Sequence, residues 1–85
     1  MKFHKLKIKE EYYDAIRRGV KRFELRKNDR EFEVGDLITF QIVDEGSIYS
    51  SLLVFQIVYI LEGVPEYGLS EDHCILGIEL LKSSV

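Results

Sequence analysis

The sequence is short of several features that mark whole classes of protein. Its 85 residues include one cysteine, Cys74, so an internal disulfide is impossible and a reducing compartment is expected. The longest apolar run, residues 51–61, is interrupted by Gln56 and is too short to cross a bilayer. The first residues contain no uninterrupted apolar segment, which argues against a signal peptide. We therefore expect a cytoplasmic protein that contacts no membrane.

The spacings typical of metal sites and nucleotide-hydrolysing sites are also missing. His73 and Cys74 are adjacent, so on a strand they point to opposite faces and cannot share a metal ion or form a nucleophilic pair. Gly19, Gly35 and Gly46 stand singly, and none belongs to a glycine-rich phosphate loop. We expect no metal, no cofactor and no nucleotide hydrolysis.

What the sequence does contain is enough apolar material for one small domain spanning residues 1–85. Hydrophobic residues make up 46% of the chain and aromatic residues 12%, which suffices for a core without disulfides or a structural metal. The net charge of −3 is unevenly distributed, because residues 1–30 carry +6 and residues 31–85 carry −9. This asymmetry fits either an anionic partner on the N-terminal elements or pairing between the two halves of the fold.

Residue periodicity predicts an α+β protein in which strands dominate. Alternation in residues 3–9 predicts a strand whose His4, Leu6 and Ile8 face the core. A short helix follows and ends at Gly19, with Tyr12, Ala15 and Ile16 on its buried face and Tyr13 at the border. Further strands are expected over residues 22–26, 37–43, 48–61 and 74–81, with a long connection over residues 62–73 and a bend or bulge at Gly77. We expect these strands to form a small, curved β-barrel with the helix packed against it.

The segment KRFELRKNDREF, residues 21–32, contains eight charged side chains among twelve positions. Alternation predicts that Phe23 and Leu25 face the core and that Arg22, Glu24 and Arg26 form a polar row on the other face. Such a row is compatible with an ordinary ladder of surface charges. It is equally compatible with a site at a barrel mouth, where an arginine fork binds phosphate or a guanine edge and Glu24 orients it.

The pattern G-x-K-x-F-E-x-R-x-N-D-R-x-F-x-x-G-D runs from Gly19 to Asp36, and VYILEG and CILGIEL follow later. With His4 at its start, this sequence closely resembles the DUF3850 group of ASCH domains, within the PUA-like superfamily. The resemblance covers nearly the whole chain. It implies a PUA-like β-barrel and binding of RNA or another nucleic acid in a cleft beside the helix. The family's polar positions carry over as Lys21, Glu24, Arg26, Asn28, Asp29 and Arg30.

A neighbouring branch of the superfamily is similar in the same segment, with the pattern G-x-K-T-x-T-x-R. Its members resemble amidohydrolases that remove the acetyl group from N4-acetylcytidine, using the lysine and the second threonine with a distant glutamate. Lys21 and Arg26 match that pattern, but Arg22 and Glu24 replace the two threonines. Because a carboxylate does not substitute simply for a hydroxyl nucleophile, the sequence favours a non-enzymatic protein.

The leading hypothesis is therefore a module that binds RNA, or another nucleic acid or nucleotide. One alternative is a small amidohydrolase acting on a modified nucleoside, with Lys21 and Glu24 as base or orienting pair. Another is a protein-interaction or dimerisation domain in which the charged row pairs across subunits. The expected nucleic-acid contacts are Lys21, Arg22, Glu24, Arg26, Lys27, Asn28, Asp29 and Arg30.

Overall fold

The computed structural model describes residues 1–81, which form six strands, one α-helix and one 3-10 turn. In chain order they are β1 (Phe3–Lys9), α1 (Glu10–Arg17), β2 (Phe23–Lys27), β3 (Leu37–Asp44), β4 (Ser47–Ser50), β5 (Phe55–Val64), η1 (Pro65–Tyr67) and β6 (Leu69–Leu80). The predicted α+β class, rich in strand with one helix, is confirmed.

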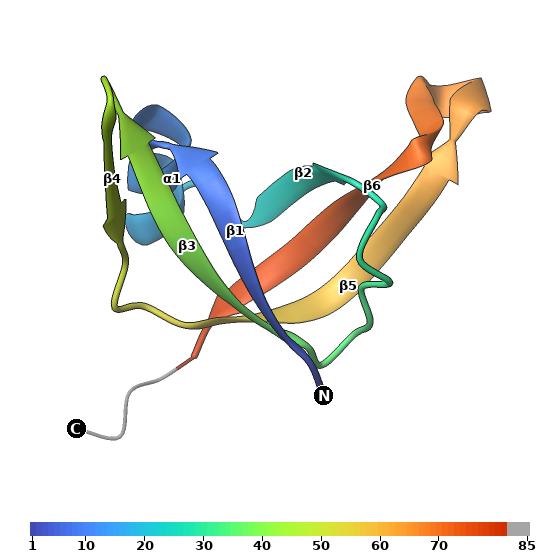
Figure 1. Ribbon diagram of the computed structural model, residues 1–85. Coiled ribbons are helices and arrows are strands. Elements are labelled where there is room, and N and C mark those ends of the chain that lie inside the picture. The colour runs from blue at the N-terminus through green and yellow to red at the C-terminus, as the bar shows by residue number, and fades with distance from the viewer. Residues whose placement is uncertain (82–85) are drawn as a thin grey trace.

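The strands form one open sheet rather than the closed barrel that the sequence predicted. Their order is β1-β3-β5-β6-β2, with β4 attached to β3; β1 and β3 are parallel and the other pairs are antiparallel. Only two residue pairs join β3 to β5, so the sheet bends there into two diverging arms (Figure 1). Within residues 1–81 no ladder joins β1 to β2, so the barrel prediction is wrong and these two strands form opposite edges of the sheet.

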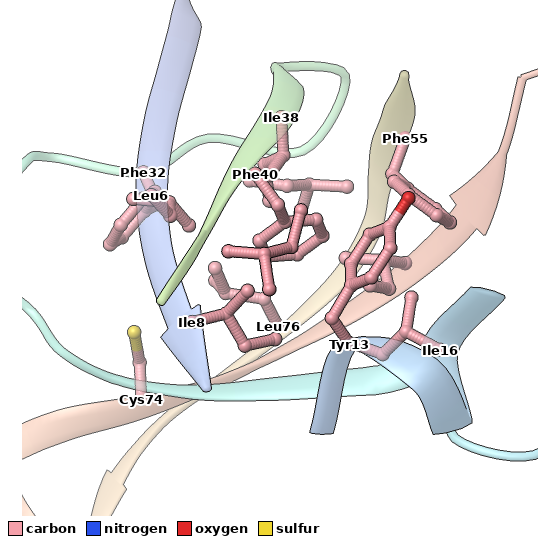
Figure 2. Packing of buried hydrophobic residues seen from close by; sticks show 13 residues of the cluster. Leu6, Ile8, Tyr13, Ile16, Phe32, Ile38, Phe40, Phe55, Cys74 and Leu76 are labelled. Atoms are coloured by element: carbon pink, nitrogen blue, oxygen red, sulfur yellow. The ribbon is translucent and has the colours of Figure 1, made fainter. Parts of the chain in front are cut away.

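The core lies between the two arms, under α1. The predicted inward face of β1 is confirmed, because Leu6 and Ile8 are buried; in β3 the buried residues are Ile38, Phe40 and Ile42. Figure 2 shows Leu6, Ile8, Ile38 and Phe40 meeting Phe55 and Leu76 from the other arm and Tyr13 and Ile16 from the helix. The prediction that Cys74 is a small buried residue on the opposite face from His73 also holds, since Cys74 is fully buried and His73 is half-exposed.

Helix α1 begins and ends as its sequence predicted. Glu10 and Glu11 lie in the first turn and Arg17 in the last, and Gly19 follows with a φ of 77°. The predicted buried face is wrong in one position, because Tyr13 and Ile16 are buried whereas Tyr12 is 47% exposed. Tyr13 also hydrogen-bonds to the hydroxyl of Ser51, which holds the helix against the β4–β5 connection.

The predicted single strand over residues 48–61 is wrong, because the chain breaks after Ser50. Strand β4 pairs with the end of β3, whereas β5 pairs with its start, where Ile38 lies opposite Phe55. The two registers differ by two residues, so one regular strand cannot satisfy both of them. The backbone N–H of Ser51 bonds to the carbonyl of Phe40, and the chain turns from there.

The predicted long connection over residues 62–73 is also wrong. Strand β5 continues to Val64, a turn at Pro65–Tyr67 follows, and β6 starts at Leu69 after Gly68, whose φ is 91°. The expected irregularity at Gly77 is present, since the β5–β6 register shifts between Ile57 and Tyr59 and Gly77 lies opposite Tyr59. A Cβ on Gly77 would lie 3.3 Å from that of Tyr59.

A buried polar pair, His4 and Asp36, links the start of β1 to the turn before β3. His4 Nε2 lies 2.8 Å from Asp36 Oδ2, and both side chains are buried. Asp36 also accepts backbone N–H bonds from Lys2 and Glu33 at 3.0 Å each. Burial alone would raise the pKa of Asp36, but the hydrogen bonds from His4, Lys2 and Glu33 outweigh it and lower the pKa to about 2. The pair keeps β1 in register at one end of the open edge.

Candidate functional site

Strand β2 turns Glu24 and Arg26 inward, opposite to the arrangement that alternation predicted. Glu24 is only 5% exposed, whereas Phe23 and Leu25 are 48% and 52% exposed. The prediction of a core-facing Phe23 and Leu25 is therefore wrong. On the inner side of β2, Lys21 and Arg26 compensate the charge of the Glu24 carboxylate. No element in residues 1–81 covers the outer side of β2.

A cleft of about 570 Å³ occupies the gap between β1, the start of α1 and β2. This is the place where a barrel would have closed. Its size falls within the range of about 300–1,000 Å³ that is usual for sites binding small organic ligands. Its lining is Lys7, Ile8, Lys9, Tyr12, Lys21, Phe23, Glu24, Leu25 and Arg26.

Glu24 is held between two cations in this cleft. Arg26 Nη1 donates to Glu24 Oε2 at 3.1 Å, and Lys21 Nζ lies 3.7 Å from Glu24 Oε1. The Lys21 ammonium also lies 4.6 Å from the ring centroid of Tyr12 and 5.2 Å from that of Phe23. The aromatic rings thus hold the lysine beside the carboxylate rather than extended into solvent.

Burial raises the pKa of Glu24, and the opposing effects of Arg26 and Lys21 only partly offset it. A buried carboxylate with a raised pKa exchanges a proton more readily near neutrality than an exposed one. In its ionised form it is a strong acceptor for amino or imino N–H groups of a ligand. The cleft therefore combines one acceptor, two cationic donors and apolar walls.

The Glu24 carboxyl group is expected to give stability that falls as pH rises. Its folded-state pKa is above the ordinary value, so the folded protein binds more protons than the unfolded chain once pH exceeds about 4.5. The free energy of unfolding should therefore decline between that pH and the folded-state pKa. Urea titrations of the wild type and Glu24→Gln across pH 4 to 8 measure this, and the difference between the two should change with pH. A pH-independent difference would contradict the raised pKa.

Two arginines bridge the open edge to β1 through its backbone. Arg26 Nη1 donates to the carbonyl of Lys7 at 2.9 Å, and Arg30 Nη1 donates to the carbonyl of Lys5 at 3.1 Å. These side-chain contacts stand where strand-to-strand hydrogen bonds would close a barrel. An anionic ligand in the cleft would find both guanidinium groups along one rim.

The other predicted site residues do not gather in this cleft. Arg22 donates through Nε to the carbonyl of Gly19, at 3.2 Å, and lies beyond the end of α1. Lys27 is exposed and alternates to the outer face with Phe23 and Leu25. Asn28 and Asp29 line a separate hollow with three glutamates, Glu31, Glu33 and Glu62. Of the eight predicted contacts, the structure brings together Lys21, Glu24 and Arg26, with Arg30 at the rim.

The sequence prediction missed the wall of the cleft opposite β2. Lys7, Ile8 and Lys9 from β1 and Tyr12 from α1 form that wall. The sequence predicts Tyr12 in the core because Tyr12 shares a helix face with Ala15 and Ile16. The available signal was the pair of adjacent tyrosines, of which a short helix buries only one.

Elsewhere in the described residues, a second hollow is unsuited to an anion and no metal ligands are clustered. A hollow of about 640 Å³ at the start of α1 is lined mainly by acids, and hydrogen bonding with Asp44 raises the pKa of Glu10 there. Such a surface repels phosphate. In residues 1–81 no three His, Cys, Asp or Glu side chains are grouped to hold a metal ion, and no helix is long and apolar enough to cross a membrane.

Comparison with known proteins supports the fold and one family. The profile of DUF3850, described as a domain of unknown function, matches residues 3–78. The structure is similar to the crystal structure of hypothetical protein PH0355, with a TM-score of 0.65 and 19% sequence identity; the match covers 95% of this chain and 100% of that chain. At this identity the likeness concerns the fold alone. No curated protein matches the chain significantly.

Proposed function

The chain belongs to the DUF3850 family, and from this premise we propose that it is an RNA-binding module whose cleft receives an unpaired base. We also propose that the domain is an ASCH domain of the PUA-like superfamily and that the protein is cytoplasmic. The observation that carries the function is the buried Glu24, held between Lys21 and Arg26 in an aromatic-walled cleft.

The chemistry of the cleft matches that of a nucleobase. A base offers an apolar face that packs against Tyr12, and an edge that carries amino or imino donors. Ionised Glu24 accepts from such an edge, as a carboxylate accepts from the amino group of cytosine. Arg26 offers a donor fork to a neighbouring carbonyl or ring nitrogen. A base without an N–H donor facing Glu24 would displace water from the carboxylate without supplying a hydrogen bond in its place, which is the source of discrimination.

The surroundings of the cleft suit a phosphate backbone. Lys5, Lys7 and Lys9 alternate along the outward face of β1, and Arg30 lies at the same rim. Residues 1–30 carry +6 although the whole chain carries −3, so attraction to an anion is confined to this side. We infer that binding is local and strongly dependent on salt.

Fluorescence anisotropy with labelled RNA tests the proposal. The protein is titrated into single-stranded and hairpin RNAs at low salt, and then into the same RNAs at rising salt. We expect binding to single-stranded RNA that weakens as salt increases, and competition by free cytidine or guanosine monophosphate. Absence of binding at low salt would refute the proposal.

A second candidate is hydrolysis of an acylated nucleoside, favoured by the 3.7 Å contact between Lys21 and Glu24. Glu24 would accept a proton from water, the resulting hydroxide would attack the acyl carbonyl carbon, and the amine would leave with that proton. Incubation with N4-acetylcytidine, followed by chromatography for cytidine and acetate, tests this. Turnover that disappears in Lys21→Ala would establish it, and its absence at high protein concentration would exclude it.

A further inference from the structure

A second feature outside the cleft is an exposed apolar face on the outer side of β2, β6 and β5. We call it the outer face, and it consists of Phe23, Leu25, Tyr59, Leu61, Ile75 and Gly77. Tyr59 is 63% exposed, and within residues 1–81 no other element covers these side chains. Contiguous exposed apolar surface of this kind marks an interaction site more often than a free surface.

The strand registers arrange this face in two rows. Phe23 and Tyr59 both lie opposite Gly77, and Leu25 and Leu61 both lie opposite Ile75. Because β6 separates β2 from β5, the backbones of Phe23 and Tyr59 stand roughly 9–10 Å apart on either side of a residue without a side chain. The result is a shallow platform with an aromatic ring at each side and bare backbone between them.

The outer face is continuous with the cleft. Phe23 and Leu25 are partly exposed on the outer face and also line the cleft, because β2 is an edge strand with the cleft on its inner side. A chain leaving the cleft therefore needs to cross only the edge of β2 to reach Tyr59. No second element of the described residues blocks that path.

The edge of β2, which such a chain would cross, has cations on both of its sides. Lys27 follows Leu25 on the outer side of β2, in register with His73 of β6. The neighbouring Asp72 is already bonded to His73 at 2.8 Å. Arg26 and Arg30 lie across the strand edge, on the cleft side. Apolar rings flanked by cations form the combination that binds single-stranded nucleic acid, in which bases stack on rings and cations follow the phosphates.

We propose that the outer face is a second contact surface for the same RNA strand, where the nucleotides next to the one in the cleft stack on Phe23 and Tyr59. This inference rests on the proposed RNA binding. In this arrangement one base lies in the cleft, the RNA backbone crosses the edge of β2 near Lys27, and the adjacent bases lie on the platform. The bound segment is therefore several nucleotides long rather than a single nucleotide.

The test compares a short and a long probe on wild type, Tyr59→Ala and a matched control. Tyr67→Ala is the control, because Tyr67 is an exposed tyrosine of the same hairpin that lies in η1, outside the outer face. The short probe is a single labelled nucleotide, which can occupy only the cleft, and the long one is a labelled RNA of about ten nucleotides; both are titrated by anisotropy. We expect Tyr59→Ala to bind the longer RNA roughly 5- to 100-fold more weakly, as the loss of a stacked base implies, and the single nucleotide unchanged. Tyr67→Ala should bind both probes as the wild type does.

The outcomes separate this inference from the function on which it rests. Equal binding of the longer RNA by Tyr59→Ala and wild type overturns the second surface but leaves the cleft proposal standing. Failure of the wild type to bind any RNA overturns both. A dimer in light scattering that becomes a monomer in Tyr59→Ala would show that a second copy covers the outer face, and this also overturns the inference. Circular dichroism establishes that each variant is folded.

Discussion

Replacement of Asp36 by alanine is expected to lower the free energy of unfolding by about 3–5 kcal/mol, the usual cost of breaking a buried polar pair. Asp36 is 1% exposed and accepts from His4 and from the backbone N–H groups of Lys2 and Glu33. Alanine would leave three donors without an acceptor, each costing about 1–3 kcal/mol if no water replaces the carboxylate.

The same carboxylate predicts a dependence of stability on pH. The pKa of Asp36 is lowered to about 2 in the folded protein, so the unfolded chain binds a proton first as pH falls. The stabilisation is fully present above about pH 4 and is lost as pH falls toward 2. Glu24 acts in the opposite sense and in a higher range, because its pKa is raised.

Urea denaturation followed by circular dichroism measures both effects. Asp36→Asn keeps the shape and one acceptor oxygen, so its loss should lie between zero and that of Asp36→Ala. Asp72→Ala is the matched control, since Asp72 also bonds to a histidine but is exposed. We expect it to change the free energy of unfolding by less than about 1 kcal/mol. If Asp36→Ala also lowered the free energy of unfolding by less than about 1 kcal/mol, the His4–Asp36 pair would not stabilise the fold.

Sequence alone predicted the elements in which one face is apolar and the other polar. Strand β1 alternates, and the structure buries His4, Leu6 and Ile8, the residues that alternation selected. The end of α1 was predictable because Gly19 adopts a positive φ that other residues resist. These are local rules, and each operates within a few residues of chain.

Predictions failed where pairing between distant segments decided the outcome. Residues 48–61 read as one apolar strand, yet β3 takes partners from both halves of that segment, at its two ends. The orientation of β2 failed for a related reason. Phe23 and Leu25 looked like core residues because local alternation does not show which face of β2 turns toward β1, and the distant pairing of β2 with β6 sets that face. Composition therefore located the candidate site, but tertiary contacts determined which side of the strand it faces.

Replacement of Arg26 by alanine is expected to weaken binding of single-stranded RNA by roughly 10- to 100-fold, about 1–3 kcal/mol for the loss of a good donor fork. Arg26 is the residue that links Glu24 to the backbone of β1, through bonds of 3.1 Å and 2.9 Å. Its removal takes away a ligand donor and also leaves Glu24 with Lys21 as its remaining cation. The pKa of Glu24 should then rise further, which reduces its capacity to accept from a base.

Two companion variants separate charge from geometry. Arg26→Lys keeps the positive charge but not the planar fork, so it should recover only part of the affinity. Arg18→Ala removes the same charge from an exposed arginine paired with Asp14 on the helix, and should bind RNA almost as the wild type does. Equal losses in Arg26→Ala and Arg18→Ala would mean that net charge alone accounts for binding.

The salt dependence of the Arg26→Ala variant then identifies the partner of the guanidinium. If Arg26 contacts a phosphate, the slope of log affinity against log salt should fall by about one, and affinity should drop equally for all sequences. If Arg26 contacts the base, the slope should stay unchanged and the loss should depend on which base occupies the cleft. The 3.1 Å bond between Arg26 and Glu24 favours the second result, because it holds the guanidinium beside the carboxylate that accepts from the base.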